Sequence, residues 1–218
     1  RRPRGAQPVS GEQAGQGGDE GGEGAQEAFR ISRPRRPLPG VRAEHGVVDA
    51  YGHVSMRHPN DPDRYLMTRL LAPELATAAD IMEFTLDSEP IDDHGRPVFL
   101  ERFIHGEIYK VRPEVNAIVH SHSPSLIPFG ASRVPLKPLY IMSAFLHPGV
   151  PVFEIRKTGG TTDLLVRNQV LGRALAESLG EKPVVLMRGH GNVVVAESIP
   201  LAVFRAVYTE TRIGNSTA

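Results

Sequence analysis

The 218-residue chain contains no cysteine and no tryptophan. The absence of cysteine excludes disulfides, thiolate zinc sites, iron–sulfur clusters and a cysteine nucleophile. No G-x-G-x-x-G or P-loop pattern occurs, which argues against the common dinucleotide and P-loop nucleotide sites. The nine histidines are therefore the obvious soft metal ligands that remain.

Further absences concern partners and location. The 25 basic and 25 acidic residues give a formal net charge of zero, so nothing attracts the whole chain to nucleic acid or to an anionic membrane. No apolar run approaches the roughly 20 residues of a membrane helix. Arg1-Arg2 is not followed by the apolar stretch of a signal peptide. We expect a cytoplasmic protein that binds neither nucleic acid nor membrane.

The composition divides the chain near residue 40. Residues 1–40 contain nine of the 22 glycines and five of the 19 prolines, with few large apolar side chains. Such a segment cannot bury enough surface to offset about 1–2 kcal/mol of backbone entropy per ordered residue. We predict a disordered tail at 1–40 and one globular domain at 41–218, which holds all nine histidines.

Short strands and helices are mixed within 41–218. Strands are expected at 53–57, 65–67, 84–86, 115–119, 150–155, 183–187 and 193–195, and helices at 101–112, at 162–179 before Gly180, and at 198–212. Because these elements do not alternate as βαβ units, the pattern favours an α/β chain of α+β arrangement, with helices covering a sheet, over a Rossmann fold.

The strongest local signal is His120-Ser121-His122, directly after an apolar strand. Side chains two residues apart on an extended segment point to the same face, so both imidazoles can reach one cation at about 2.0–2.1 Å. This motif alone is weak evidence, because two histidines at the end of a strand are also common on surfaces.

Two further elements could complete a metal site. In Arg188-Gly189-His190-Gly191-Asn192, the glycines on both sides of the histidine let the backbone bend and approach a ligand closely. Glu101 begins a predicted helix, where a carboxylate can also serve only as a partner of the helix dipole. Three imidazoles and one carboxylate with an open position would be a catalytic arrangement that admits zinc, iron, nickel, copper or manganese.

These motifs together resemble the class II aldolase/adducin family. The resemblance rests on Leu100-Glu101-Arg102-Phe103-Ile104-His105, on His120-x-His122 and on Arg188-Gly189-His190-Gly191, and it spans about residues 44–212. It implies that His120, His122 and His190 ligate a divalent metal, and that Glu101 is an acid/base residue that can also ligate it. It further implies a catalytic domain with a mostly antiparallel sheet flanked by helices, and a homotetramer with active sites at subunit interfaces.

The family includes sugar-phosphate aldolases, decarboxylases of hydroxylated aromatic acids, oxygen-using iron enzymes and the non-enzymatic adducin head. Where the aldolases bind phosphate through small residues, this chain has Gly52-His53-Val54-Ser55, Met67-Thr68-Arg69-Leu70 and Phe99-Leu100. The backbone approach that cradles a phosphate is lost, whereas Arg69 offers a planar fork for a carboxylate. The pattern is therefore most similar to the decarboxylase branch, such as the hydroxy-methylpyridine-dicarboxylate decarboxylases.

The resemblance implies a lyase that removes CO2 from a small hydroxylated aromatic or heteroaromatic carboxylate, with one Mn²⁺ or Zn²⁺ ion. The ion would stabilise the enolate-like charge that remains. Glu101, His53 or His105 would protonate the carbon, and Ser55 and Arg69 would contact the substrate. An iron oxygenase of the aminocoumarin type with Fe²⁺, a sugar-phosphate aldolase and an adducin-like scaffold remain alternatives. The other histidines are expected at surfaces or turns, namely His45, His58, His94 and His147.

Overall fold

The computed structural model describes residues 51–214, without the side chains of 211–214. The tail predicted at 1–40, together with His45, lies outside the described residues. Over the described part, no helix is long and apolar enough to cross a membrane.

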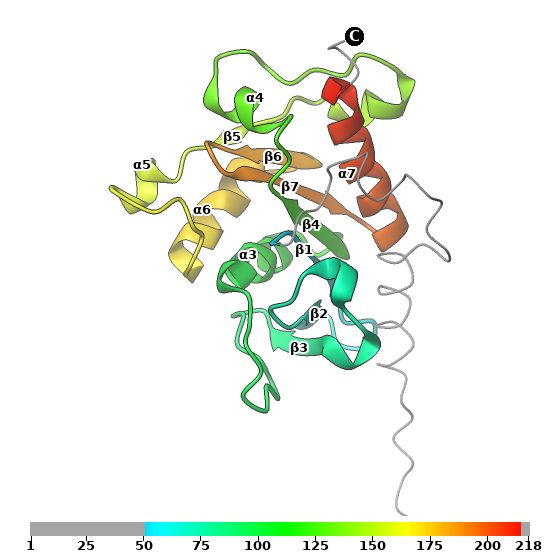
Figure 1. Ribbon diagram of the computed structural model, residues 1–218, viewed down its shortest axis with the longest axis vertical. Coiled ribbons are helices and arrows are strands. Elements are labelled where there is room, and N and C mark those ends of the chain that lie inside the picture. Colours follow the sequence, from blue (N-terminus) through cyan, green and yellow to red (C-terminus); the bar gives the residue numbers. More distant parts are fainter. Residues whose placement is uncertain (1–50, 215–218) are drawn as a thin grey trace, which may run out of the picture.

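Seven strands form one sheet in the order β3-β2-β1-β4-β7-β6-β5 (Figure 1). They are β1 (His53–Arg57), β2 (Arg64–Thr68), β3 (Ile81–Thr85), β4 (Ala117–Ser121), β5 (Val152–Phe153), β6 (Val184–Met187) and β7 (Gly191–Ala196). Neighbouring strands pair antiparallel, except that β5 runs parallel to β6. The predicted α+β arrangement with a mostly antiparallel sheet is confirmed, and each of the predicted strand segments overlaps a strand.

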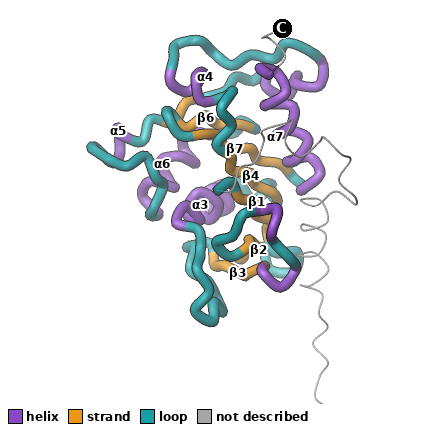
Figure 2. The backbone as a smooth tube through the Cα atoms, in the orientation of Figure 1, coloured by secondary structure: helices purple, strands orange, loops and turns teal. Residues whose placement is uncertain are grey.

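Helices lie on both faces of this sheet, as the tube in Figure 2 shows. The α-helices are α3 (Phe103–Val111), α4 (Ile127–Ala131), α5 (Arg156–Gly159), α6 (Gln169–Leu179) and α7 (Ile199–Gly214). Short 3-10 helices are η1 (Pro73–Leu75), η2 (Ala78–Asp80), η3 (Leu100–Arg102) and η4 (Ile141–Leu146).

The alternation of side chains along the central strands divides the core into two layers. Ile118 of β4 and Val193 of β7 pack in one buried cluster with α3 and α6. Val119 and Val194, each one residue further along, pack in a second cluster with α4 and α7. Because β4, β6 and β7 are covered on both faces, they consist of consecutive buried residues instead of alternating apolar and polar ones.

The helix predicted at 162–179 is wrong in its first third. The helix α6 begins at Gln169, and the Asn168 side chain caps it by accepting a hydrogen bond from the Leu171 amide at 3.0 Å. Leu164 has a φ of 70°, which cannot continue a right-handed helix. The apolar residues before Asn168 imitate an amphipathic pattern, but they belong to a loop that reaches the candidate site.

Candidate metal centre and the histidine network beside it

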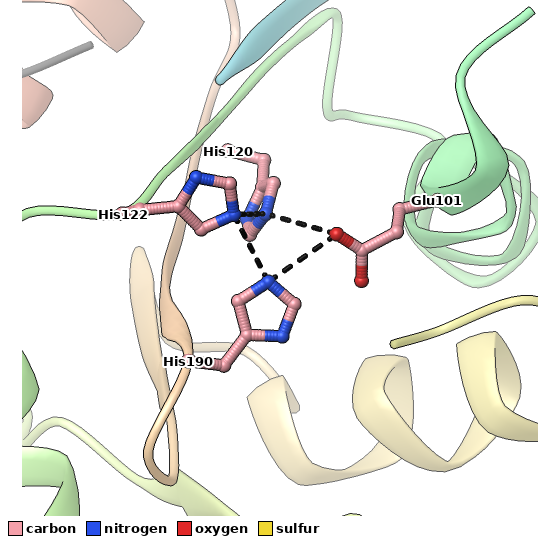
Figure 3. A group of neighbouring side chains, drawn as sticks. All are labelled: Glu101, His120, His122 and His190. Carbon is pink, nitrogen blue, oxygen red and sulfur yellow. Dashed lines mark hydrogen bonds and ion pairs between the residues drawn. The ribbon is translucent and has the colours of Figure 1, made fainter. Parts of the chain in front are cut away.

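Four predicted ligands meet at one point in the structure (Figure 3). One ligating atom each from Glu101, His120, His122 and His190 lies within 4.8 Å of the others. His122 Nε2 is 3.1 Å from His120 Nε2 and 3.0 Å from His190 Nε2. The Glu101 Oε2 atom is 3.5 Å from His120 Nε2 and 3.2 Å from His190 Nε2. We call these four residues the ligand group.

The backbone around each ligand explains why the side chains converge. His120 lies on β4, on the same face as Ile118, so its ring enters the layer that α3 and α6 cover. His190 lies in the turn between β6 and β7, where Gly189 adopts a left-handed φ of 69°. A Cβ atom on Gly191 would lie 2.2 Å from the Ser121 carbonyl oxygen. Glycine at both positions therefore lets the turn bring His190 against the end of β4, as the motif predicted.

Backbone carbonyls fix which nitrogen of two imidazoles faces inward. His120 Nδ1 is 3.0 Å from the Asn192 carbonyl oxygen, and His190 Nδ1 is 2.8 Å from the Leu164 carbonyl oxygen. Because a carbonyl oxygen only accepts, each Nδ1 atom carries the hydrogen, and the Nε2 atom of the neutral ring presents a lone pair. Both lone pairs then point toward the Glu101 carboxylate.

The donor set fits a divalent cation. Lone pairs and a carboxylate repel one another at these distances unless a positive charge lies between them. Tetrahedral zinc with bonds of about 2.0–2.1 Å separates its ligand atoms by roughly 3.4 Å; the four distances given above are 3.0 to 3.5 Å, and every pair of ligand atoms lies within 4.8 Å. Three imidazoles and one carboxylate also suit manganese or iron.

The charge of Glu101 is stabilised from two sides. Burial raises the pKa of the Glu101 carboxyl; when the His120 and His190 rings are protonated on both nitrogens, their hydrogen bonds and charges outweigh burial and hold that pKa well below its usual range. The second oxygen, Oε1, accepts a hydrogen bond from the Val166 amide at 2.8 Å. Glu101 is therefore an anion whose Oε2 atom is directed at the imidazoles of His120 and His190.

A second group of polar side chains lies beside the ligand group and runs into the core. The His53 ring is 4.9 Å from the His120 ring, and His53 Nδ1 is 2.7 Å from His105 Nε2. His105 Nδ1 is 2.5 Å from Ser55 Oγ, which is 2.8 Å from the Tyr109 hydroxyl. We call these four residues the histidine–hydroxyl chain; each is at most 2% exposed.

Both rings of this chain are neutral at pH 7. Burial, followed by the charges of His105 and His120, holds the pKa of His53 well below its ordinary value. Burial also lowers the pKa of His105 to about 3. A neutral ring has one hydrogen and one lone pair, so each link of the chain has a defined direction.

Residues 42–214 match the model of the family described as the class II aldolase and adducin N-terminal domain. The chain belongs to that family. It is 43% identical over 178 residues to the decarboxylase tropJ of Talaromyces stipitatus, covering 76% of this chain and 67% of that protein. It is 31% identical over 193 residues to a 3,4-dihydroxyphthalate decarboxylase of Arthrobacter keyseri, covering 81% and 73%. An aldolase II superfamily protein from Pseudomonas syringae has the same fold, with a TM-score of 0.69 at 21% identity over 90% of this chain and 75% of that one.

Within this class II aldolase and adducin family member, the predicted site residues His53, His105 and Ser55 lie beside the ligand group or behind it. His105, predicted to face the site one helical turn after Glu101, lies behind His53 and is fully buried. The Ser55 hydroxyl contacts His105 and Tyr109, so its position favours support of His105, and its contact with substrate stays a prediction. Arg69 follows β2, and its Nε atom pairs with Asp80 Oδ1 at 2.7 Å.

The other predicted surface histidines in the described part are not ligands of this group. His94 lies in a turn with its side chain 72% exposed, and His147 is also exposed. His58 is half-buried just after β1.

Sequence reasoning missed three contributors to the site. Leu164 and Val166 act through backbone groups of the loop before α6, which leave no side-chain signature. Tyr109 had a signal, because it lies four residues after His105 on one helix and therefore on the same face.

Proposed function

We propose that this class II aldolase and adducin family member is a divalent-metal-dependent decarboxylase of a hydroxylated aromatic or heteroaromatic carboxylic acid. That it is an enzyme of the carbon–carbon lyase type follows from its family and from relatives that are named decarboxylases. The observation that carries the proposal is the convergence of His120, His122, His190 and Glu101, which an adducin-like scaffold has no need to keep.

The ligand group and the residues around it have separate roles in the proposed reaction. His120, His122 and His190 would hold a divalent cation, which would supply Lewis-acid stabilisation of the negative charge left on the substrate when CO2 departs. Glu101, held at Oε1 by the Val166 amide, keeps Oε2 available to ligate the cation or to carry a proton. Asp80 holds only the Nε atom of Arg69, so the two terminal nitrogens remain for a substrate carboxylate. The Phe99 ring, 4.6 Å from the His53 ring, adds apolar surface beside the polar chain.

The proposal includes assembly and location. Relatives in the family are expected to form tetramers with interfacial active sites, and this chain exposes Val134, Leu139 and Ile141 by 60%, 77% and 81% in the segment that contains η4. Exposed apolar side chains grouped in one segment favour a contact between subunits. We expect a homotetramer in the cytoplasm. Light scattering coupled to gel filtration measures the number of subunits.

The reaction can be tested with purified protein stripped of metal and reloaded with Mn²⁺, Zn²⁺ or Fe²⁺. With 3,4-dihydroxyphthalate as trial substrate, we expect metal-dependent release of CO2 without consumption of O2. Phthalate, which lacks the hydroxyls, is the matched control and should react more slowly. Uptake of O2 with Fe²⁺ would instead indicate an oxygenase. Cleavage of a ketose phosphate, with no action on carboxylates, would indicate an aldolase; either result overturns the proposal.

A further inference from the structure

The histidine–hydroxyl chain has one end beside the ligand group and one end in the core. At the outer end, His53 Nε2 has no hydrogen-bond partner within the described part of the chain. This atom is not completely buried, so a ligand can reach it. At the inner end, the Tyr109 hydroxyl has Ser55 Oγ as its hydrogen-bond partner, and no other is found among residues 51–214. The outer end is therefore open to a ligand, and the inner end is closed.

The hydrogens of such a chain can run in two directions. In the outward direction, Tyr109 donates to Ser55, Ser55 donates to His105 Nδ1, and His105 Nε2 donates to His53 Nδ1. In the inward direction every link is reversed, so that His53 Nδ1 donates and the Tyr109 hydroxyl only accepts. Ring nitrogens and hydroxyls allow both patterns at the observed distances of 2.5 to 2.8 Å.

The closed inner end distinguishes the two directions. In the inward pattern the hydrogen of the Tyr109 hydroxyl points into the core without an acceptor, although Tyr109 is 1% exposed. A buried donor without a partner carries a substantial penalty. In the outward pattern every hydroxyl and ring hydrogen inside the chain has an acceptor. A mixed pattern, in which Ser55 accepts from both Tyr109 and His105, leaves the Ser55 hydrogen without an acceptor among residues 51–214. The hydrogens therefore run outward.

We infer that Ser55 is a positioning residue whose hydroxyl fixes His53 in the tautomer with its hydrogen on Nε2, so that His53 donates a hydrogen bond to an oxygen of the bound substrate; Tyr109 donates to Ser55 and closes the chain behind it. The tautomer follows from the described contacts alone, whereas the substrate oxygen rests on the proposed function. The ring of His53 lies 4.9 Å from that of His120, so a ligand oxygen on the cation side of His120 is within its reach.

This assignment selects the chemistry of the substrate. A neutral donor at this position matches an acceptor, such as a carboxylate or phenolate oxygen, and does not match a group that only donates. It also gives His53 a binding role in place of general-base catalysis, because its lone pair is committed to His105.

The tautomer can be measured directly in the Zn²⁺-loaded, full-length protein with ¹⁵N-labelled histidine. Long-range ¹H–¹⁵N correlation distinguishes hydrogen on Nε2 from hydrogen on Nδ1, and His53→Gln assigns the signals. In the wild type we expect the Nε2 form to exceed the Nδ1 form by at least about tenfold. A predominant Nδ1 form would overturn the inference.

Three variants locate the source of the bias. Ser55→Ala removes the hydroxyl that donates to His105, and the ratio should fall to within about threefold of unity. Tyr109→Phe leaves Ser55 as the terminal hydroxyl, so the ratio should stay close to that of the wild type. Tyr65→Phe is the matched control, because the Tyr65 hydroxyl donates to the Arg102 carbonyl oxygen at 3.2 Å, outside the chain. An unchanged ratio in Ser55→Ala, or a loss only in Tyr109→Phe, would contradict the role given to Ser55.

Binding provides a second readout. If half of the His53 rings in Ser55→Ala carry hydrogen on Nε2, the Kd for 2-hydroxybenzoate should weaken about twofold with metal content unchanged. An unchanged Kd would overturn the substrate contact even where the tautomer shifts. If no carboxylate is decarboxylated but the tautomer ratios are as expected, the proposed reaction fails and the tautomer assignment stands.

Discussion

The ligand group and the histidine–hydroxyl chain use the same side chain in opposite ways. In the ligand group, backbone carbonyls accept the Nδ1 hydrogens of His120 and His190, which leaves lone pairs on Nε2. In the chain, hydroxyls donate toward His105, and the Nε2 atom of His53 is left with a hydrogen. The partner of the far nitrogen thus decides whether an imidazole in this site is suited to bind a cation or to donate to an anion.

The largest expected effect comes from deleting a ligand. In His120→Ala the cation loses one of three imidazoles, so we expect loss of stoichiometric metal and a fall in kcat/KM of more than about 10³-fold. Elemental analysis of the purified protein and the decarboxylation rate measure the two effects. His94→Ala, which changes an exposed histidine, should retain both. Full metal content in His120→Ala would show that the ligand assignment is wrong.

Glu101 is the acidic member of the ligand group. Its replacement by glutamine tests the negative charge while keeping the shape of the side chain. Glu101→Gln keeps the side-chain length but removes the anion that the imidazoles and the Val166 amide stabilise. We expect kcat to fall by about 10²- to 10⁴-fold, the range for loss of a positioned acid or base. Circular dichroism should show an intact fold. If kcat falls less than tenfold, Glu101 is neither the proton carrier nor a needed charge.

The sequence made the ligand group predictable because its motifs are local. His120 lies on β4 and His122 directly follows the end of that strand, and the glycines beside His190 mark the turn that brings it to them. The apolar runs likewise predicted the central strands, since full burial leaves no polar alternation.

The histidine–hydroxyl chain was predictable only in part. His53, His105 and Ser55 were recognised as candidates, but their order in space depends on how β1 packs against α3. The loop before α6 was mistaken for helix because backbone contacts, such as Val166 N to Glu101, do not constrain side-chain type. A capping asparagine at 168 was the one local signal that the helix starts later.

Gly191 tests how closely β4 and β7 must approach to form the ligand group. In Gly191→Ala the new Cβ would meet the Ser121 carbonyl oxygen at 2.2 Å, and backbone cannot move as a side-chain end can. We expect a loss of about 3 kcal/mol in the free energy of unfolding, measured by urea denaturation. In Gly159→Ala the nearest atom is a flexible Leu171 methyl at 3.3 Å, so that control should change stability by no more than about 0.5 kcal/mol. Equal stability of the two variants would show that β4 and β7 can move apart at this position.

The smallest expected effect concerns the loop before α6, whose backbone contacts the ligand group at Glu101 and His190. Asn168→Ala removes the cap of α6 and should lower the free energy of unfolding by about 1 kcal/mol. The same change loosens the segment whose Leu164 carbonyl holds the Nδ1 hydrogen of His190, so metal affinity should fall by about tenfold, the lower end for loss of a contact that orients a ligand. The His53 tautomer should not change, because no contact of the histidine–hydroxyl chain involves this loop. Asn168→Asp keeps an acceptor for the Leu171 amide and should restore both stability and metal affinity. A shift of the His53 tautomer in Asn168→Ala would show that the two regions are coupled through the loop and that their opposite tautomers are not set independently.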